Sequence, residues 1–192
     1  MSTRFLLIRH AESAWNAERR WQGHADPPLS PRGVAQAEAL ARSLAGERAD
    51  RLLCSDLQRA RHTAEIVGRG LGLRASADPG LRELDVGTWE GLTRQEIAAR
   101  DPDALARFDA GEPEQPAGGA ESRAALRERV HATFRSLAAA YPEEQLVVVT
   151  HLGVVRALLP HAELPNGGTA RLTAEQLVGS AEAARALNAE RR

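Results

Sequence analysis

Short runs of branched apolar residues recur along the chain, and each ends abruptly at polar residues. Such runs occupy residues 5–8, 52–53 and 146–150. Strands that are buried on both faces of a parallel sheet have this length and composition, so the three runs are predicted to be parallel strands. Ligands of such sheets bind outside the carboxyl ends of the strands, and functional residues are expected there.

Between these runs, apolar residues recur every three or four positions, as on one face of a helix. This spacing predicts helices over residues 34–44, 57–67 and 126–141. Ser55 and Asp56 precede the second helix. They are predicted to form its N-cap region, because their side-chain oxygens accept hydrogen bonds from the first backbone N–H groups.

The C-terminal part of the chain continues the alternation. A helix through residues 154–158 is predicted to end near Pro160, a last strand to span residues 169–172, and a final helix to begin at about Ala174. Strands that alternate with helices predict an α/β fold, here a three-layer α/β/α arrangement with a mostly parallel central sheet and helices on both faces.

Glycine and proline mark the predicted turns. Residues 111–119 hold two prolines and three glycines, which predicts a loop suited to a lid or to substrate selection. Gly68, Gly70 and Gly72 follow a predicted helix instead of joining a strand to one. They are therefore interpreted as a helix C-cap and turn, and not as a dinucleotide-binding loop.

The composition limits the classes of partner. Of the 192 residues 27% are charged, and the net charge is −1. Without a basic field, the chain is expected to bind neither nucleic acid nor an anionic membrane. The length fits a single domain over residues 1–192, and the lack of an apolar run long enough for a signal peptide or membrane span predicts a cytoplasmic protein.

Neither the cysteine nor the scattered histidines indicate a metal site. The single cysteine, Cys54, excludes an internal disulfide and is interpreted as a small buried residue. His24, His62, His131 and His161 lack the spacing of known zinc motifs, so they are predicted to lie at the surface or in turns.

Charged and catalytic residue types gather at one predicted edge of the sheet. Arg9 and His10 follow the first strand, His151 follows the strand over residues 146–150, and Arg59 falls in the first turn of the helix after the second strand. Glu83 lies in a non-helical segment that is able to cross this edge. Because a guanidinium matches a phosphate or carboxylate, the predicted ligand is an oxyanion.

Six blocks of sequence resemble the histidine phosphatase superfamily, also called the phosphoglycerate-mutase-like superfamily. The first block, Arg9-His10-Ala11-Glu12-Ser13, is similar to the family signature. The blocks occur in order at residues 9–13, 21–37, 55–64, 81–91, 119–122 and 147–153. The resemblance implies phosphomonoester hydrolysis through a phosphohistidine.

The resemblance also implies roles for five residues. His10 is the expected nucleophile, since a neutral imidazole attacks phosphorus readily when its second nitrogen donates a hydrogen bond to a nearby backbone carbonyl. Arg9, Arg59 and a protonated His151 are expected to surround the transferring group. Glu83 is expected to protonate the leaving oxygen and then to activate water.

Glu83 has an alternative interpretation as a surface carboxylate paired with Arg82 or Arg94. Asp85 and Glu90 are the local competitors for the acid role. Without the resemblance, the sequence favours the surface pairing.

Substrate-binding positions follow from the resemblance with less detail. Asn16, Gln22 and Gly23 match positions that line the phosphate or substrate pocket in the family. Ala11 and Leu152 stand where glycine is usual, so each is expected to narrow the anion pocket. Leu152 is accordingly counted among the residues that contact substrate.

The predicted function is a metal-independent phosphomonoester hydrolase without a cofactor. Its substrate is expected to be a small phosphorylated metabolite, with broad-specificity, α-ribazole phosphate and sugar phosphate or phosphoglycerate types left open. Arg94, Arg100 and Arg107 are candidates for a second anion contact. The first alternative is a cofactor-dependent phosphoglycerate mutase, although such mutases usually have a longer insertion than residues 90–121. The second is a non-catalytic domain that binds a phosphorylated ligand. A homodimer is left open.

Overall fold

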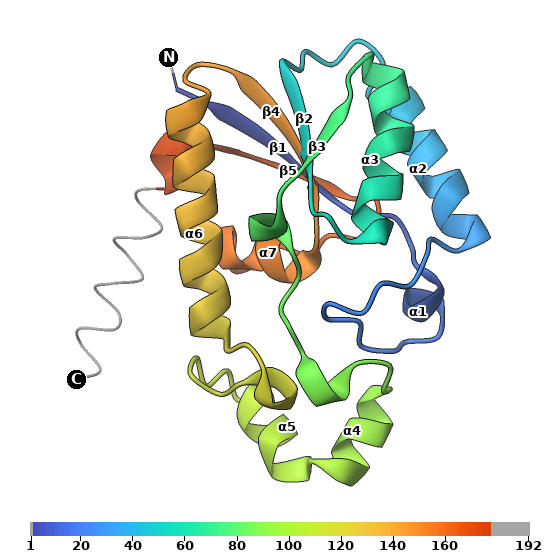
Figure 1. Cartoon of the computed structure of the whole chain (residues 1–192), viewed down its shortest axis with the longest axis vertical. Helices are drawn as coiled ribbons and strands as arrows, with labels where there is room; N and C mark the ends of the chain where they lie inside the picture. Colours follow the sequence, from blue (N-terminus) through green and yellow to red (C-terminus); the bar gives the residue numbers. More distant parts are fainter. Residues whose placement is uncertain (1, 178–192) are drawn as a thin grey trace.

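The computed structural model describes residues 2–177 and builds them around a five-stranded sheet (Figure 1). The strands are β1 (Arg4–Arg9), β2 (Arg51–Cys54), β3 (Ala75–Ala77), β4 (Gln145–Thr150) and β5 (Thr169–Thr173). In the order β3-β2-β4-β1-β5, neighbouring strands are parallel except for β1 and β5. The prediction of a mostly parallel sheet is confirmed.

Helices cover both faces of this sheet, as predicted (Figure 1). The helices are α1 (Ala14–Ala17), α2 (Pro31–Ser43), α3 (Gln58–Leu71), α4 (Arg94–Arg100), α5 (Pro102–Asp109), α6 (Arg123–Ala140) and α7 (Leu152–Leu158), with 3-10 turns η1 (Pro79–Leu81), η2 (Gly87–Trp89) and η3 (Ala117–Gly119). Leu6 and Ile8 of β1 pack toward α3, whereas Phe5 and Leu7 belong to the cluster with Phe134 of α6. Successive residues of a strand point to opposite faces, so β1 joins both layers.

The first turn of α3 differs from the prediction. Its N-cap is Leu57, which makes no side-chain cap hydrogen bond. Ser55 Oγ instead accepts a hydrogen bond from Leu57 N at 3.3 Å, and Asp56 pairs with Arg82. Arg59 still lies in the first helical turn, so the error of one to two residues leaves its predicted place unchanged.

The three glycines near the end of α3 have two different roles. Gly72 is the C-cap, with φ of 68°, as predicted. Gly68 and Gly70 lie inside α3, so their assignment to the cap and turn was wrong. A Cβ at Gly68 would lie 2.5 Å from Leu73 O, and one at Gly70 would lie 2.8 Å from Ala41 O. Glycine therefore allows the close approach of the neighbouring backbone.

The segment between η2 and α6 lies beyond the carboxyl edge of the sheet (Figure 1). Trp21, Trp89 and Phe108 hold it in place, with ring centroids 5.4–5.7 Å apart. Trp89 is fully buried and donates a hydrogen bond from Nε1 to Asp101 Oδ2 at 2.8 Å. This aromatic cluster forms a wall near the predicted site.

The last described residues agree with the prediction for the C-terminus. A helix begins at Ala174, and its predicted continuation beyond Leu177 lies outside the described residues. Within residues 2–177, none of the helices has the length and apolar character that crossing a membrane requires.

Candidate active site

The two predicted histidines meet at the carboxyl ends of β1 and β4. His10 follows β1 and His151 follows β4, and His10 N donates a hydrogen bond to Thr150 O at 2.8 Å. Their ring centroids lie 5.1 Å apart. Both side chains are buried, because the parallel strands deliver them to the same covered edge.

The ring of His10 is held in one tautomer. Its Nδ1 lies 2.7 Å from Ala11 O, as the sequence predicted. A carbonyl oxygen only accepts, so Nδ1 carries the proton and Nε2 keeps its lone pair. Burial, with the charges of Arg59 and Arg9, lowers the pKa of His10 to about 3. His10 is therefore neutral near pH 7, as a nucleophile requires.

His151 differs from the prediction of a protonated imidazole. Burial, the charge of Arg59 and the proximity of His10 hold the pKa of His151 well below its ordinary value. Among the described residues, neither of its ring nitrogens has a hydrogen-bond partner. In the free site His151 is neutral, and both of its ring nitrogens are buried beside His10.

Arg9 and Arg59 are anchored through their terminal nitrogens. Arg59 donates to Gly23 O and Ala25 O, both at 2.8 Å, and Arg9 donates to Leu164 O at 2.7 Å. In both residues Nε is buried and has no partner among the described residues. Burial lowers the pKa of Arg59 to about 10, so the guanidinium stays charged near pH 7. An oxyanion bound in the cavity that Arg9 and Arg59 line would meet two charged guanidinium groups.

Glu83 crosses the same edge, as predicted. Its Oε1 accepts a hydrogen bond from Leu84 N at 2.9 Å, and Oε2 accepts one from Gly153 N at 3.2 Å. The alternative pairing was wrong, because Arg82 pairs with Asp56 and Arg94 with Asp109.

The two competing acids have structural partners. Glu90 Oε1 accepts hydrogen bonds from His24 N and Ala25 N at 2.7 and 2.9 Å. Asp85 Oδ1 accepts one from Gly87 N at 2.9 Å. Neither Glu90 nor Asp85 lines the cavity at the site, whereas Glu83 does.

These residues surround a cavity of about 600 Å³. The predicted site residues that line it are Arg9, His10, Asn16, Gln22, Gly23, Arg59, Glu83 and Leu152. The ninth, His151, is fully buried beside His10. Trp21 and Phe108 of the aromatic cluster also line the cavity, but no residue between 111 and 119 does. The loop predicted to act in substrate selection therefore lies outside the cavity in this structure.

A hydrogen-bond network connects the binding residues to the nucleophile. Ser13 Oγ donates to Gln22 Oε1 at 2.7 Å, and Asn16 Oδ1 accepts from Ser13 N at 3.1 Å. Asn166 Nδ2 lies 3.1 Å from both Asn16 Oδ1 and His10 O. Asn166 was missed from the sequence, where nothing distinguishes it from other loop asparagines.

The two departures from glycine have different effects. Ala11 is fully buried in a cluster with Leu29, Ala37 and Ile66, so the expectation that it narrows the anion pocket was wrong. Leu152 lines the cavity, where it was expected.

The candidates for a second anion contact were also wrong. Arg94 pairs with Asp109 and Arg100 with Asp101, and neither they nor Arg107 lines the cavity. The arginines that do line it outside the predicted set are Arg20, Arg123, Arg127 and Arg156. The spacing of Arg123 and Arg127, one helical turn apart, was the available signal for two of them.

The scattered histidines form no metal site in residues 2–177, where no group of three potential ligands is arranged to hold an ion. His24 Nε2 lies 2.9 Å from Glu83 O, next to the site. The prediction of a surface position was wrong for His131, which is 6% exposed.

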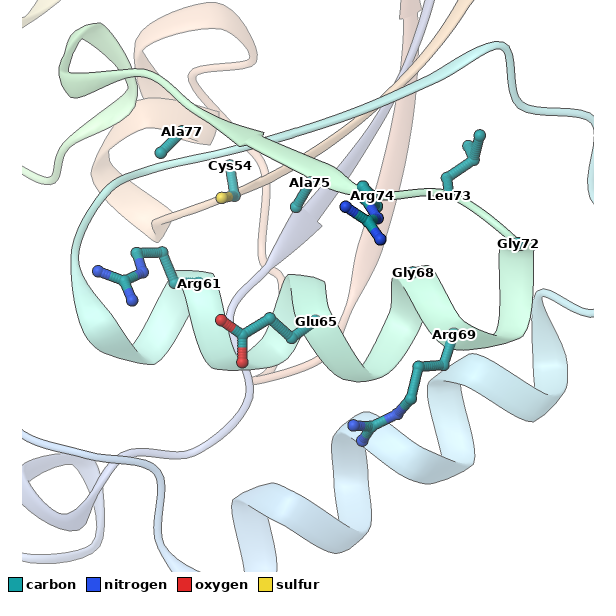
Figure 2. Close-up of a pocket in the computed structure, with 10 residues that line it drawn as sticks. All are labelled: Cys54, Arg61, Glu65, Gly68, Arg69, Gly72, Leu73, Arg74, Ala75 and Ala77. Atoms are coloured by element: carbon teal, nitrogen blue, oxygen red, sulfur yellow. The ribbon is translucent and has the colours of Figure 1, made fainter.

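A second cavity of about 610 Å³ lies between α3 and the edge strand β3 (Figure 2). Cys54 of β2 lines it, and burial raises the pKa of this thiol to about 11. The thiol is thus protonated near pH 7 and is no nucleophile. The interpretation of Cys54 as a small buried residue is confirmed.

Comparison with known proteins agrees with the geometry. Residues 5–177 match the family model described as histidine phosphatase superfamily, branch 1. The chain is 36% identical to phosphoglycerate mutase-like protein 4 of Arabidopsis thaliana, over 82% of this chain and 70% of that protein. It is 34% identical to glucosyl-3-phosphoglycerate phosphatase of Mycobacterium tuberculosis, over 92% of this chain and 85% of that protein.

Solved structures show the same similarity. The mycobacterial glucosyl-3-phosphoglycerate phosphatase in complex with VO3 has a TM-score of 0.81 at 31% identity, covering 88% of this chain and 90% of that one. A protein described as a putative alpha-ribazole-5'-P phosphatase from Escherichia coli has a TM-score of 0.81 at 29% identity, covering 90% and 91%.

Proposed function

The chain belongs to the histidine phosphatase superfamily and is a phosphoric monoester hydrolase, and from this premise we propose that His10 is its nucleophile. One observation carries the proposal. The neutral ring of His10, whose Nδ1–H donates a hydrogen bond to Ala11 O, lies at a cavity that Arg9 and Arg59 also line. No described partner of His10 competes with a phosphorus atom for Nε2.

In the first step, the lone pair of His10 Nε2 attacks phosphorus. A bond forms between nitrogen and phosphorus while the bond from phosphorus to the ester oxygen breaks. The leaving oxygen takes the electron pair of that bond and a proton from the Glu83 carboxyl group. The alcohol leaves, and the phosphorylated ring keeps its proton on Nδ1, which still donates a hydrogen bond to Ala11 O.

In the second step, water replaces the nitrogen. The Glu83 carboxylate removes a proton from the water, whose oxygen forms a bond to phosphorus as the bond to His10 breaks. Phosphate is released, His10 returns to its neutral form, and Glu83 is again protonated for the next cycle.

Positive charge around the transferring group supports both steps. The guanidinium groups of Arg9 and Arg59 line the cavity with His10, and the ring of His151 lies beside that of His10. A phosphate dianion near His151 favours its charged form, so ligand binding is expected to raise the pKa of His151 and to take up a proton.

The substrate is a small phosphate ester, and we place it in the sugar phosphate or phosphoglycerate type. The similarity to glucosyl-3-phosphoglycerate phosphatase supports this choice, since it extends over 92% of the chain. A phosphoglycerate mutase activity is the second candidate, because relatives include a mutase-like protein at 36% identity. Incubation with 3-phosphoglycerate and a trace of 2,3-bisphosphoglycerate to phosphorylate the histidine separates the two: a hydrolase yields glycerate and phosphate, whereas a mutase yields 2-phosphoglycerate.

Hydrolysis of p-nitrophenyl phosphate with a chelator present tests the proposal. Wild-type protein is expected to release p-nitrophenol, and His10→Ala to release none while keeping the wild-type melting temperature within a few degrees. Equal rates for the two proteins would remove His10 from the reaction.

A further inference from the structure

Three arginines that line the cavity come from helices α6 and α7. Arg123 and Arg127 lie one turn apart on α6, and Arg156 lies in the last turn of α7. We call these three residues the α6–α7 arginine cluster. They were not among the predicted site residues.

Within the described residues, no carboxylate forms an ion pair with a member of this cluster; Asp109, which pairs with Arg94, acts on Arg123 only through its charge. Arg123 stacks on the ring of Phe108 at 3.9 Å, and Arg156 Nε donates to Ala162 O at 3.1 Å. By contrast, Arg82 pairs with Asp56 and Arg129 with Glu121. The cluster is therefore a set of available cations in a concave site.

The arginines that line the cavity bring several positive charges close together. Arg156 lines the same cavity as Arg9 and Arg123, and its charge lowers the pKa of both. Among the described residues that line the cavity, Glu83 is the single acidic one. A cleft with one sign of charge concentrates oppositely charged ligands, although the whole chain has a net charge of only −1.

The start of α6 adds to this unfavourable charge. The positive end of the helix dipole lies there, and the first turn holds Arg123 and no acidic residue. Arg123 and Arg127 at positions i and i+4 also repel each other. A bound anion would relieve both effects.

We propose that the α6–α7 arginine cluster binds a second anionic group of the substrate, a carboxylate or a further phosphate on the leaving group. The inference rests on the proposed function, which places the transferring phosphoryl group at His10. It adds that the preferred substrates carry two anionic groups, one at the histidines and one at the cluster. Esters with a neutral leaving group are then poor substrates.

Matched pairs of ligands test this separately from turnover. Calorimetric titration of His10→Ala, which leaves the ligand intact, compares 3-phosphoglycerate with glycerol 3-phosphate, and fructose 1,6-bisphosphate with fructose 6-phosphate. The first pair differs by a carboxylate and the second by a phosphate. The ligand with the second anion is expected to bind about tenfold more tightly or better, because charge-assisted hydrogen bonds contribute at least this much. For each pair we compare the dissociation constant of the ligand that lacks the second anion with that of the ligand that has it. The pair with the larger ratio of these two constants identifies the anion.

The variants Arg127→Gln and Arg156→Gln, each combined with His10→Ala, are expected to bring that ratio close to one. Arg135→Gln is the matched control, since it removes the same charge from an exposed position of α6 outside the cavity. It is expected to leave the ratio unchanged.

The outcomes separate the two proposals. If neither pair shows a preference, or if the Arg135 variant lowers the ratio as much as the cluster variants do, the arginine subsite is refuted whatever the turnover. If the ratio behaves as expected while wild-type protein fails to hydrolyse any of these esters, the subsite stands and the proposed hydrolysis through His10 fails.

Discussion

At the residue scale, the state of each ionisable group follows from its surroundings more than from its type. The motif around Arg9 and His10 was readable from the sequence, because a strand end and a basic dipeptide are local features. The neutral state of His151 was not, since it depends on complete burial beside Arg59. The core position of Ala11 was missed for the same reason: its neighbours come from distant helices.

Burial of neutral His10 predicts a pH-dependent stability. The pKa of about 3 in the folded protein is lower than the value of about 6.5 expected when the chain unfolds, so the unfolded state binds more protons between these pH values. The free energy of unfolding is expected to rise with pH over this range and to level off above pH 6.5. From pH 5 to pH 7, His10 should contribute about 2 kcal/mol.

Urea unfolding of wild type and His10→Asn at pH 5 and pH 7 measures this contribution. The variant is expected to gain less stability than wild type between the two pH values. Identical gains would show that His10 is not held neutral in the fold.

The role of Glu83 predicts a dependence on the leaving group. Glu83→Gln is expected to slow alkyl phosphates by about 10²–10⁴-fold, because an alkoxide needs a proton from the acid, and to slow p-nitrophenyl phosphate far less. Steady-state kcat for the two substrate kinds tests this. Equal losses on both would exclude Glu83 as the general acid.

At the element scale, long regular elements were predictable and short connecting ones were not. The apolar runs in the sequence predicted β1 and β4, and the helical spacing of apolar residues predicted most of α2, α3 and α6. Helices α4 and α5 have only seven and eight residues, and their buried residues are few, so no periodic pattern marked them. Their place was set by the contacts of Trp89 and Phe108.

The segment that carries Glu83 is held by its neighbouring elements. Arg129 of α6 donates hydrogen bonds to Gly80 O, Arg82 O and Glu83 O at 3.0–3.2 Å. Thr150 at the end of β4 donates to Leu81 O at 2.8 Å. These contacts are long-range in sequence, which is why the orientation of Glu83 required the structure.

The contact between Glu83 and α7 predicts the effect of a single methyl group. A Cβ at Gly153 would lie 2.1 Å from Glu83 Oε1, so Gly153→Ala is expected to displace the carboxylate. Activity on alkyl phosphates should fall at least tenfold, while the melting temperature stays close to that of wild type because alanine favours the helix by about 1 kcal/mol. Kinetics and thermal unfolding together check this; full activity would show that Glu83 is not fixed at this position.

At the scale of the whole molecule, one sheet edge gathers groups from nearly the full length of the chain. Arg9 and Arg156 both line the cavity, and the packed layers on both sides of the sheet connect them. Residues 2–177, which the structure describes, are therefore expected to form one cooperative unit. Urea unfolding followed by tryptophan fluorescence and by circular dichroism should give coincident single transitions, whereas separate transitions would indicate more than one domain.

The most direct test of the account is to trap the phosphorylated enzyme. Wild type and Glu83→Gln are mixed with p-nitrophenyl phosphate, quenched in alkali to preserve phosphohistidine, digested and mapped by mass spectrometry. A phosphoryl group is expected on His10, with more of it in Glu83→Gln because the attacking water then lacks its base. Product formation with no phosphoryl group on His10 at any time, or with the group on another residue, would contradict it.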